Sequence, residues 1–355
     1  MSDAANRFPP GRERVRALLE SALLRIWYET DRPPLWARMG EVIFSRLAAA
    51  RRLLYRKGLK KSFRVPVPVI VVGNLAVGGT GKTPLVLWLC EWLAARGRRP
   101  GIVCRGYRGR SAYWPRQVSA DSDPYEVGDE AVLLARRSRV PVWAGPKRAD
   151  AARALLAQGV DVIVSDDGLQ HYALARDVEF VVVDAMRGFG NRHRLPAGPL
   201  REAESRLQEA DFLVVNGEGN FDQDRWLTMR VRAAELRNLA RPDLCPALDT
   251  VSGWRVHAVA GIGHPQRFFD TLAALGIEYT PHVFPDHADW TGLPFDFGDD
   301  RPVIMTEKDA VKCRSWTREN FWYLVVVADF DTTDSKRLAT RLSALLSGDE
   351  EYEAL

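Results

Sequence analysis

The sequence predicts an α/β fold in which a mostly parallel sheet has helices on both faces, with a smaller C-terminal α/β domain and an N-terminal amphipathic helix. Three observations support this prediction. Short runs of β-branched residues alternate with helical segments over most of the chain, which is typical of parallel sheets with helical connections. A glycine-rich loop joins the first such run to the helix after it. The first 62 residues instead combine basic residues with apolar residues at helical spacing.

The composition is that of a globular protein long enough for two domains: 355 residues, of which 46% are hydrophobic and 27% charged. The four cysteines are Cys90, Cys104, Cys245 and Cys313. They show no CxxC or Cys/His spacing, which indicates a reducing compartment and argues against a structural metal site. The N-terminus lacks the apolar run of a signal peptide, and no run of about 18 apolar residues follows. We therefore expect a protein that is neither secreted nor membrane-spanning.

The N-terminal segment, residues 1–62, carries 14 Lys and Arg against 6 Asp and Glu, so its net charge is +8 and that of the remainder is −4. Between residues 34 and 61, apolar residues recur every three or four positions, which predicts an amphipathic helix. They are Leu35, Trp36, Met39, Val42, Ile43, Leu47, Leu53 and Leu54. Basic residues gather at the end of this helix, a combination that suits an anionic membrane surface. The alternative, that the stripe packs on the protein's own core, stays open.

Residues 63–220 are expected to form the first α/β domain. Its predicted strands are residues 67–73, 101–104, 140–144, 160–167, 178–184 and 211–216. Its predicted helices are residues 83–96, 129–137 and 148–158, and an irregular stretch covers residues 188–204. Continuously apolar strands are buried on both faces, so helices are expected on both sides of the sheet.

Residues 221–250 have the pattern of a small antiparallel or connecting element, because charged and apolar residues alternate there. A second α/β set follows in residues 251–355. Its predicted strands are residues 256–262, 302–306 and 322–328, and its predicted helices are residues 265–275 and 334–346. We expect this C-terminal domain to complete a cleft with the first domain.

A phosphate-binding loop is predicted directly after the first strand, in the sequence NLAVGGTGKTP. Its candidate ligand-binding residues are Gly78, Gly79, Thr80, Gly81, Lys82 and Thr83. The glycines let the backbone turn tightly and point its amides at a phosphate, next to the N-terminal dipole of the following helix. The lysine can reach the β- and γ-phosphates, and the threonine after it can ligate Mg²⁺. Ala76 replaces one glycine of the strict motif, but the other features of a P-loop NTPase remain.

Two adjacent carboxylates, Asp166 and Asp167, end the predicted strand of residues 160–167. The C-terminal ends of parallel strands face the ligand crevice, so these side chains are expected beside the phosphate loop. One of them can hold Mg²⁺, directly or through water, so that the metal bridges the phosphates. The alternative is that the aspartate pair only forms a turn or a helix cap.

Phosphoryl transfer to a hydroxyl group benefits from a side chain that accepts the hydroxyl proton. Asp129, at the start of a predicted helix, can be this base or only a first-turn acid that stabilises the helix dipole. His264 follows a strand of the second domain and can assist a carboxylate across the cleft, although a loop histidine can equally be solvated and without a role. The residues alone leave both alternatives open.

Together these segments resemble one family, the tetraacyldisaccharide 4'-kinases of the lipid A pathway in Gram-negative bacteria. The resemblance spans nearly the whole chain and includes the basic amphipathic N-terminus. The matching motifs are VGNLAVGGTGKTP (72–84), CRGYRG (104–109), VGDEA (127–131), SDDGLQHYALARD (165–177), LPAGPLRE (195–202), AGIGHPQRFF (260–269) and TEKDAVK (306–312). Several motifs in one order are far more specific than a phosphate loop alone.

The resemblance implies transfer of the γ-phosphate of ATP, with Mg²⁺, to the 4'-hydroxyl of a tetraacylated glucosamine disaccharide 1-phosphate, which gives lipid IVA. The acceptor is a membrane lipid. The amphipathic N-terminus would then place the cleft at the level of the saccharide headgroup. We expect a peripheral protein on the cytoplasmic face of the bacterial inner membrane, with the lipid substrate and the membrane surface as partners and no nucleic acid.

The resemblance also implies roles for individual residues. Lys82 and Thr83 would contact nucleotide and magnesium, Asp166 and Asp167 would form the metal pair, and Asp129 with His264 would form a base dyad. The side chains implied to line the acceptor or phosphate site are Arg105, His171, Arg201 and Glu202. The TEKD segment receives no role, because Lys308 is followed directly by Asp309 and therefore departs from the NKxD motif of GTPases.

Two other functions are compatible with a phosphate loop. ATPase switches that partition cargo or deliver metals have a similar loop, but they often carry an additional lysine before the glycine pair, where this chain has Val77. The function of such a switch also does not explain the GPLRE and GHP motifs. A nucleic-acid-dependent ATPase would be stimulated by DNA or RNA and inhibited by salt, and no motif supports it.

Overall fold

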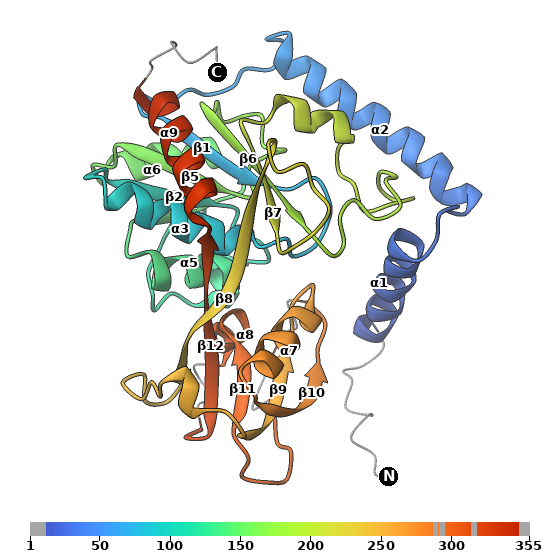
Figure 1. Ribbon diagram of the computed structural model, residues 1–355. Coiled ribbons are helices and arrows are strands. Elements are labelled where there is room, and N and C mark those ends of the chain that lie inside the picture. Colours follow the sequence, from blue (N-terminus) through green and yellow to red (C-terminus); the bar gives the residue numbers. More distant parts are fainter. Residues whose placement is uncertain (1–11, 287–289, 291–294, 314–317, 348–355) are drawn as a thin grey trace.

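The computed structural model describes residues 12–286, 290, 295–313 and 318–347. In this part of the chain, twelve strands form one sheet in the order β10-β9-β11-β12-β8-β7-β6-β1-β5-β2-β4-β3 (Figure 1). The strands are β1 (Val69–Gly73), β2 (Pro100–Cys104), β3 (Arg116–Val118), β4 (Val142–Ala144), β5 (Val162–Asp166), β6 (Val178–Asp184), β7 (Phe212–Asn216), β8 (Trp226–Asn238), β9 (Arg255–Ala260), β10 (Glu278–Val283), β11 (Val303–Thr306) and β12 (Phe321–Phe330). The α-helices are α1 (Arg12–Tyr28), α2 (Leu35–Arg56), α3 (Lys82–Ala94), α4 (Pro124–Val127), α5 (Asp129–Ser138), α6 (Arg148–Leu156), α7 (Pro265–Ala274), α8 (Glu307–Lys312) and α9 (Thr332–Ser347).

The strand β1 lies in the interior of the sheet, between β5 and β6, and runs parallel to both. Successive side chains of a strand point to opposite faces. Ile70 and Val72 accordingly join the core on one face, while Val69 and Val71 join the core on the other. The strand is apolar throughout because both of its faces are buried.

Helices cover both faces of this part of the sheet, which we call the N-terminal lobe. The helices α3, α5 and α9 share the core of Ile70 and Val72, whereas α6 packs with Val69 and Val71. The predicted mostly parallel sheet with helices on both faces is therefore confirmed. The antiparallel pairs are β3 with β4 and β8 with β12.

The strands β9, β10 and β11 run parallel, and together with α7, α8 and the adjoining ends of β8 and β12 they form the C-terminal lobe. Figure 1 shows this lobe below the N-terminal lobe, with β8 and β12 running between them. Leu236 and Leu324 belong to its core. Met229 and Ala328, on the same two strands, belong to the core of the N-terminal lobe instead. The two lobes are therefore joined by a continuous antiparallel pair of strands.

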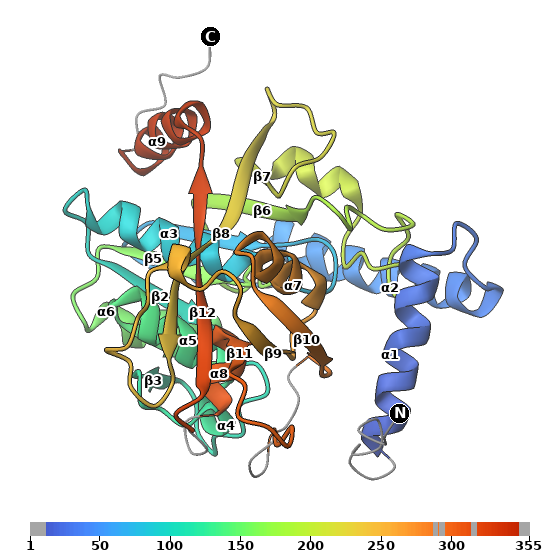
Figure 2. The ribbon, with the colours of Figure 1, turned by 60° about the horizontal axis from the view of Figure 1, so that its bottom comes forward.

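The structure corrects the predicted domain boundaries. Residues 221–250 do contain an antiparallel element, but β8 is an integral strand of the sheet rather than a separate connection. The assignment of all of residues 251–355 to a C-terminal domain is wrong for its last part, because Phe330, Leu338 and Leu342 pack in the core of the N-terminal lobe. Figures 1 and 2 both show α9 beside the N-terminal lobe.

The helices α1 and α2 lie on the outside of the N-terminal lobe in both views (Figures 1 and 2). Polar contacts attach them: Trp27 Nε1 donates to the carbonyl of Pro196 at 2.9 Å, and Glu41 Oε2 lies 2.8 Å from His193 Nδ1. The apolar side chains of α2 point away from this attachment and are 50–71% exposed. They are Leu35, Trp36, Met39, Val42, Ile43, Leu47 and Leu53. The alternative that this stripe packs on the protein's own core is therefore wrong for these residues.

No helix in the described part of the chain combines the length and the apolar character that crossing a membrane requires.

Candidate active site

The phosphate loop connects β1 to α3 and is shaped by two glycines in the left-handed region. Gly78 has φ 115° and Gly81 has φ 93°, values that a residue with a side chain adopts only with strain. Gly81 also has no room for a side chain, because Asn216 of β7 lies against it and donates from Nδ2 to the carbonyl of Thr80 at 3.0 Å. Ala76 does not have positive φ, which explains why an alanine is accepted where the strict motif has glycine.

A buried asparagine supports the other side of the loop. Asn74 follows β1, and its Nδ2 donates to the carbonyls of Ala76 at 2.7 Å and Gly78 at 3.3 Å. Its Oδ1 accepts a hydrogen bond from Arg201. The loop is therefore held in shape by its own strand end and by a cation from the LPAGPLRE motif.

Three charged side chains meet at the start of α3. Lys82 Nζ lies 3.4 Å from Asp167 Oδ1, and Arg201 Nη1 lies 3.4 Å from Asp167 Oδ2. Burial by itself would raise the pKa of Asp167, but the attraction of Lys82 and Arg201 outweighs it and holds this pKa well below its ordinary value. Asp167 is therefore ionised at neutral pH and orients both cations toward the loop.

Asp166 ends β5 and is 4% exposed. Burial, with a further contribution from Glu130, raises its pKa. Its Oδ1 is buried and has no hydrogen-bond partner in the described part of the chain, and the same is true of Thr80 Oγ1. Buried polar atoms without partners are costly unless a ligand or water satisfies them, so these atoms fit a bound metal and phosphate.

A group of three or more His, Cys, Asp or Glu side chains around one point is absent from the described residues. Mg²⁺ is usually held by one or two carboxylates together with phosphate oxygens and water. The predicted ligands Thr83, Asp166 and Asp167 are of the type that Mg²⁺ prefers, and they come from the first turn of α3 and the end of β5.

His264 lies at the end of the loop that follows β9 and occupies the N-cap position of α7. Its ring faces the N-terminal lobe. Its Nδ1 lies 3.2 Å from Oδ2 of Asp184, the last residue of β6. Arg267 of α7 pairs with Asp184 Oδ1 at 3.1 Å and donates to the carbonyl of Asn216. The partner of His264 Nδ1 is therefore Asp184, and the dyad of Asp129 with His264 stays a prediction.

The loop that carries His264 lies directly on the phosphate loop. A Cβ on Gly263 would be 3.1 Å from the backbone nitrogen of Gly79 and 3.4 Å from Asp286 Oδ2. Only a glycine permits this approach without displacing a neighbour. The two lobes therefore contact each other at the point where a nucleotide phosphate is expected.

Asp129 is the first residue of α5 and is 6% exposed. Its Oδ1 accepts a hydrogen bond from the amide of Glu130 at 2.8 Å, which is the geometry of a first-turn acid. The preceding Gly128 has φ 94° and lies against the carbonyl of Tyr107. The CRGYRG and VGDEA motifs are thus packed together, and both alternatives for Asp129 remain compatible with its position.

The four residues predicted to line the acceptor or phosphate site differ in their surroundings. Arg105 follows β2 and is exposed. Burial, together with nearby arginines, lowers the pKa of His171 to about 4, so its ring is neutral at pH 7. Arg201 is engaged by Asp167 and Asn74 as described above. Glu202 is 9% exposed and accepts a hydrogen bond from the hydroxyl of Tyr172 at 2.6 Å, which indicates that it orients its neighbours.

Sequence reasoning missed Asp184 and Lys308. Asp184 is the last residue of its strand, as Asp166 is of β5, and a carboxylate at a strand end could have been predicted as a site residue on that ground. Lys308 lies in the TEKD motif, which received no role. Its Nζ is 2.9 Å from Glu130 Oε1 and 3.1 Å from Asp286 Oδ1, so it connects the two lobes beside Asp129.

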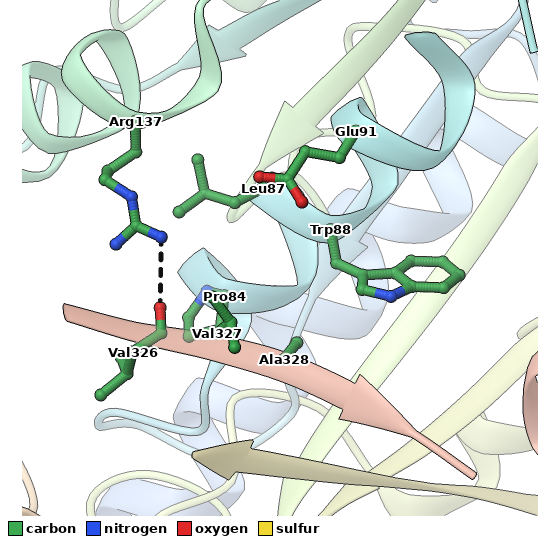
Figure 3. Close-up of a pocket in the computed structure, with 8 residues that line it drawn as sticks. All are labelled: Pro84, Leu87, Trp88, Glu91, Arg137, Val326, Val327 and Ala328. Carbon is green, nitrogen blue, oxygen red and sulfur yellow. Dashed lines mark hydrogen bonds between the residues drawn. The ribbon is translucent and has the colours of Figure 1, made fainter. Parts of the chain in front are cut away.

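A small cavity between α3, α5 and β12 is separate from this site (Figure 3). Its volume is about 10 Å³, enough for roughly one water molecule. It is lined by Pro84, Leu87, Trp88, Glu91, Arg137, Val326, Val327 and Ala328. It is too small for a nucleotide and marks instead where β12 packs against α3 and α5.

Known proteins similar to this chain agree with the geometry. A family model described as tetraacyldisaccharide-1-P 4'-kinase matches residues 36–347. Tetraacyldisaccharide 4'-kinases from Alkalilimnicola ehrlichii and Methylobacillus flagellatus are 52% and 48% identical, over 89% and 91% of this chain and 96% of each relative. A crystal structure of LpxK from Aquifex aeolicus, described as the "apo" form in complex with ATP, is 28% identical, with a TM-score of 0.73 over 92% of this chain and 99% of that one. The chain therefore belongs to the tetraacyldisaccharide-1-P 4'-kinase family.

Proposed function

We propose that this protein transfers the γ-phosphate of ATP to the 4'-hydroxyl of tetraacyldisaccharide 1-phosphate, forming lipid IVA. One observation carries the proposal: a phosphate loop with Lys82, beside the buried Asp166 and the half-buried Asp167, is faced by the His264 loop of the second lobe. This arrangement has the parts that phosphoryl transfer needs, which are positioning and neutralisation of charge.

Lys82 and the amides of Gly79 to Gly81 are proposed to bind the phosphates of ATP. Asp166 Oδ1, Asp167 and the hydroxyl of Thr83 are the proposed ligands of Mg²⁺. When bound, Mg²⁺ supplies a positive charge that neutralises the charge developing on the phosphate oxygens. Arg201 would keep Asp167 ionised and correctly turned, because it bonds both this carboxylate and Asn74.

Asp129 and His264 are the candidates for proton transfer from the 4'-hydroxyl. Asp184 accepts from His264 Nδ1, and within the described part of the chain Nε2 has no recorded partner, so Nε2 can exchange a proton with substrate. We therefore propose a chain of Asp184 and His264 in place of a direct contact between Asp129 and His264. Asp129 would be the carboxylate base on the opposite side of the cleft.

Arg105 and His171 are proposed to contact the acceptor, since both follow strands that end at the phosphate-loop edge. A neutral His171 can accept or donate a hydrogen bond to a sugar hydroxyl. Glu202 is proposed to act through Tyr172 rather than on the acceptor itself, because its Oε2 is already bonded to that hydroxyl.

The exposed apolar stripe of α2 is proposed to lie on the inner membrane, on its cytoplasmic face. Basic residues of the same helix, including Arg46, Arg51 and Arg56, would contact anionic headgroups while Trp36 and Ile43 enter the interface. The lipid acceptor could then be phosphorylated without leaving the bilayer. This explains why the stripe is exposed although its burial would be favourable.

The direct test is incubation of the purified protein with γ-labelled ATP, Mg²⁺ and detergent-dispersed tetraacyldisaccharide 1-phosphate. We expect label in the lipid phase at the 4' position. ATP hydrolysis without labelled lipid would contradict the proposal and would favour an ATPase switch.

The membrane proposal is tested by flotation with liposomes that contain anionic lipid. Met39→Glu combined with Ile43→Glu should lower the bound fraction about tenfold, because two charges would have to enter the interface. Leu345→Glu, on the exposed side of α9, is the matched control and should bind as the unmodified protein does. Equal binding of all three proteins would contradict an α2 docking surface.

A further inference from the structure

The TEKD segment, Thr306–Asp309, is the sequence motif that has no role so far. It spans the last residue of β11 and the first turn of α8, where the C-terminal lobe meets the N-terminal lobe. Its side chains contact one another, the loop before His264, and α5. Their contacts divide into one set that holds the His264 loop and another that holds α5.

Thr306 and Asp309 hold the start of the His264 loop. Asp309 is fully buried, and its Oδ2 accepts from the amide of Gly261 at 2.8 Å and from the hydroxyl of Thr306 at 2.7 Å. Gly261 lies three residues before His264 and two before Gly263, which touches the phosphate loop. Oδ1 of the same carboxylate lies 3.0 Å from Lys312 Nζ as an ion pair without hydrogen-bond geometry, so the two hydrogen bonds at Oδ2 are what fix the path of this loop.

Lys308 holds the N-terminal turn of α5. Its Nζ bridges Glu130 Oε1 at 2.9 Å and Asp286 Oδ1 at 3.1 Å. Burial alone would lower the pKa of Lys308, but the carboxylates of Glu130, Asp286 and Asp129 outweigh it and raise this pKa above its ordinary value. The ammonium is therefore charged, and its field acts on Asp129 as well as on the two bonded carboxylates.

Glu307 holds the C-terminal turn of α5. Both of its carboxylate oxygens lie 2.6 Å from Arg137 Nη1, and the side chain of Glu307 is 9% exposed. Figure 3 shows Arg137 reaching from α5 to the carbonyl of Val326 on β12. The helix α5 is therefore fastened to α8 at both ends, by Lys308 near Asp129 and by Glu307 about two turns later.

We infer that the TEKD segment is a positioning element that sets the distance between His264 and Asp129 across the cleft. The inference rests on the proposed function, in which these two residues handle the hydroxyl proton. Thr306 and Asp309 fix one of them through Gly261, and Lys308 with Glu307 fix the other through α5. The segment is inferred to act on the geometry of these two side chains rather than on ATP or the acceptor.

A simpler explanation is that Thr306 only caps α8 and that the ion pairs only stabilise the fold. Thr306 does accept from the amide of Asp309 at 3.2 Å, which is an N-cap contact. The two explanations differ in kinetics. A cap contributes to stability whether or not His264 is present, whereas a positioning element loses its effect once the side chain that it positions is removed.

The experiment is a double-mutant cycle between Thr306→Val and His264→Ala, measured as kcat for lipid phosphorylation. Thr306→Val keeps the shape but removes the hydroxyl that bonds Asp309. We expect it to lower kcat about tenfold while the Kd for ATP changes less than about twofold, because the loop shifts by a fraction of an ångström. Thr306→Ser, which keeps the hydroxyl, should restore most of kcat.

On the His264→Ala background, Thr306→Val should lower kcat less than about twofold further. Additive losses in the two variants would overturn the inference while leaving the kinase function intact. A normal kcat in His264→Ala alone would instead contradict the proposed role of His264. In that case the inference is tested by the second cycle, at Lys308 and Asp129.

The second cycle combines Lys308→Met with Asp129→Asn. Lys308→Met should lower kcat about thirtyfold, and Lys308→Arg should recover part of it, because a cation is restored beside Glu130 and Asp286. With Asp129→Asn present, the additional loss should be less than about threefold. Additivity here, or equal losses in Lys308→Met and Lys308→Arg, would overturn the inference. If Lys308→Met does not fold, Asp286→Asn replaces it, because the Asp286 side chain is more exposed than that of Lys308.

Discussion

The two edges of the candidate active site, one from each lobe, are built in different ways. On the N-terminal lobe, Lys82 begins α3 directly after the phosphate loop, and Asp166 and Asp167 are the last residue of β5 and the one after it, so each is positioned by the adjoining loop or strand end. On the C-terminal lobe, His264, Asp286 and Lys308 come from three separate segments. The first edge therefore depends on local backbone geometry, and the second on how distant segments pack.

The comparison extends to the partners of each edge. Asp167 finds Lys82 and Arg201 within its own lobe, whereas His264 and Lys308 find Asp184 and Glu130 in the other lobe. Substitutions in the first edge should remove phosphate binding itself. Damage to the second should leave the nucleotide bound and affect the transfer step.

The largest effect is expected from Lys82→Met. Removing the cation that faces the phosphates should lower kcat/KM about 10³-fold, in the range seen when one charge-stabilising donor is removed from an active site. The variant should also bind ATP more weakly, because Lys82 contacts the ground state as well. Lipid phosphorylation and the Kd for ATP are the measurements.

The matched control for that variant is Lys336→Met, which removes an exposed lysine of α9. It should change kcat/KM less than about twofold, as surface changes usually do. A folded Lys82→Met protein with normal turnover would contradict the phosphate-binding role assigned to the first edge.

Asp184→Asn tests the second edge. It should lower kcat about 10²-fold while the Kd for ATP stays within about threefold, because His264 loses the carboxylate that orients its Nδ1. Asparagine can still accept the amide hydrogen bonds of Met186 and Arg187, so the fold should be kept. Equal losses in kcat and in ATP affinity would show that the two edges do not divide their roles.

Asp329→Asn is the control for Asp184→Asn. It breaks the exposed ion pair with Arg232, which is 3.3 Å long, and should leave kcat within about twofold.

The difference between the edges also explains what sequence could predict. Gly78 to Thr83 and the Asp166–Asp167 pair form contiguous motifs at strand ends, and their place in a parallel sheet follows from the alternation of strands and helices. The sheet itself was predictable because β1 and β5 are apolar on both faces. These features depend on residues close together in sequence.

The contacts that sequence did not predict join residues far apart. The partner of His264 depends on β6 lying beside β1 and on the docking of the second lobe, neither of which a motif encodes. The return of α9 to the first lobe depends on β12 extending beyond the C-terminal core. For α2, spacing alone could not distinguish burial from exposure, because both give the same apolar stripe.

A smaller effect is expected where the two edges touch, at Gly263. Gly263→Ala places a Cβ 3.1 Å from the nitrogen of Gly79, so one loop has to shift by a few tenths of an ångström. We expect kcat/KM for ATP to fall about tenfold, with little change in Tm. Gly263→Val should be worse in the same direction. Equal activity of all three proteins would show that the loops do not approach each other this closely during turnover.

The smallest effect compares one histidine from each lobe. In the folded protein, burial and nearby arginines, foremost Arg148, lower the pKa of His171 to about 4, and burial together with His257 lowers that of His282 to about 4. The unfolded chain binds these protons near pH 6.5, the folded one only near pH 4, so stability is lost as the pH falls between these values.

Replacing either histidine by glutamine should therefore reduce the loss of unfolding free energy between pH 6.5 and pH 4. The reduction should be at most about 2 kcal/mol for His171, because its partly exposed ring is screened by solvent. It should be smaller for His282, which faces fewer cations. Urea unfolding at both pH values measures it. A larger change for His282→Gln would reverse the expected order of the two histidines.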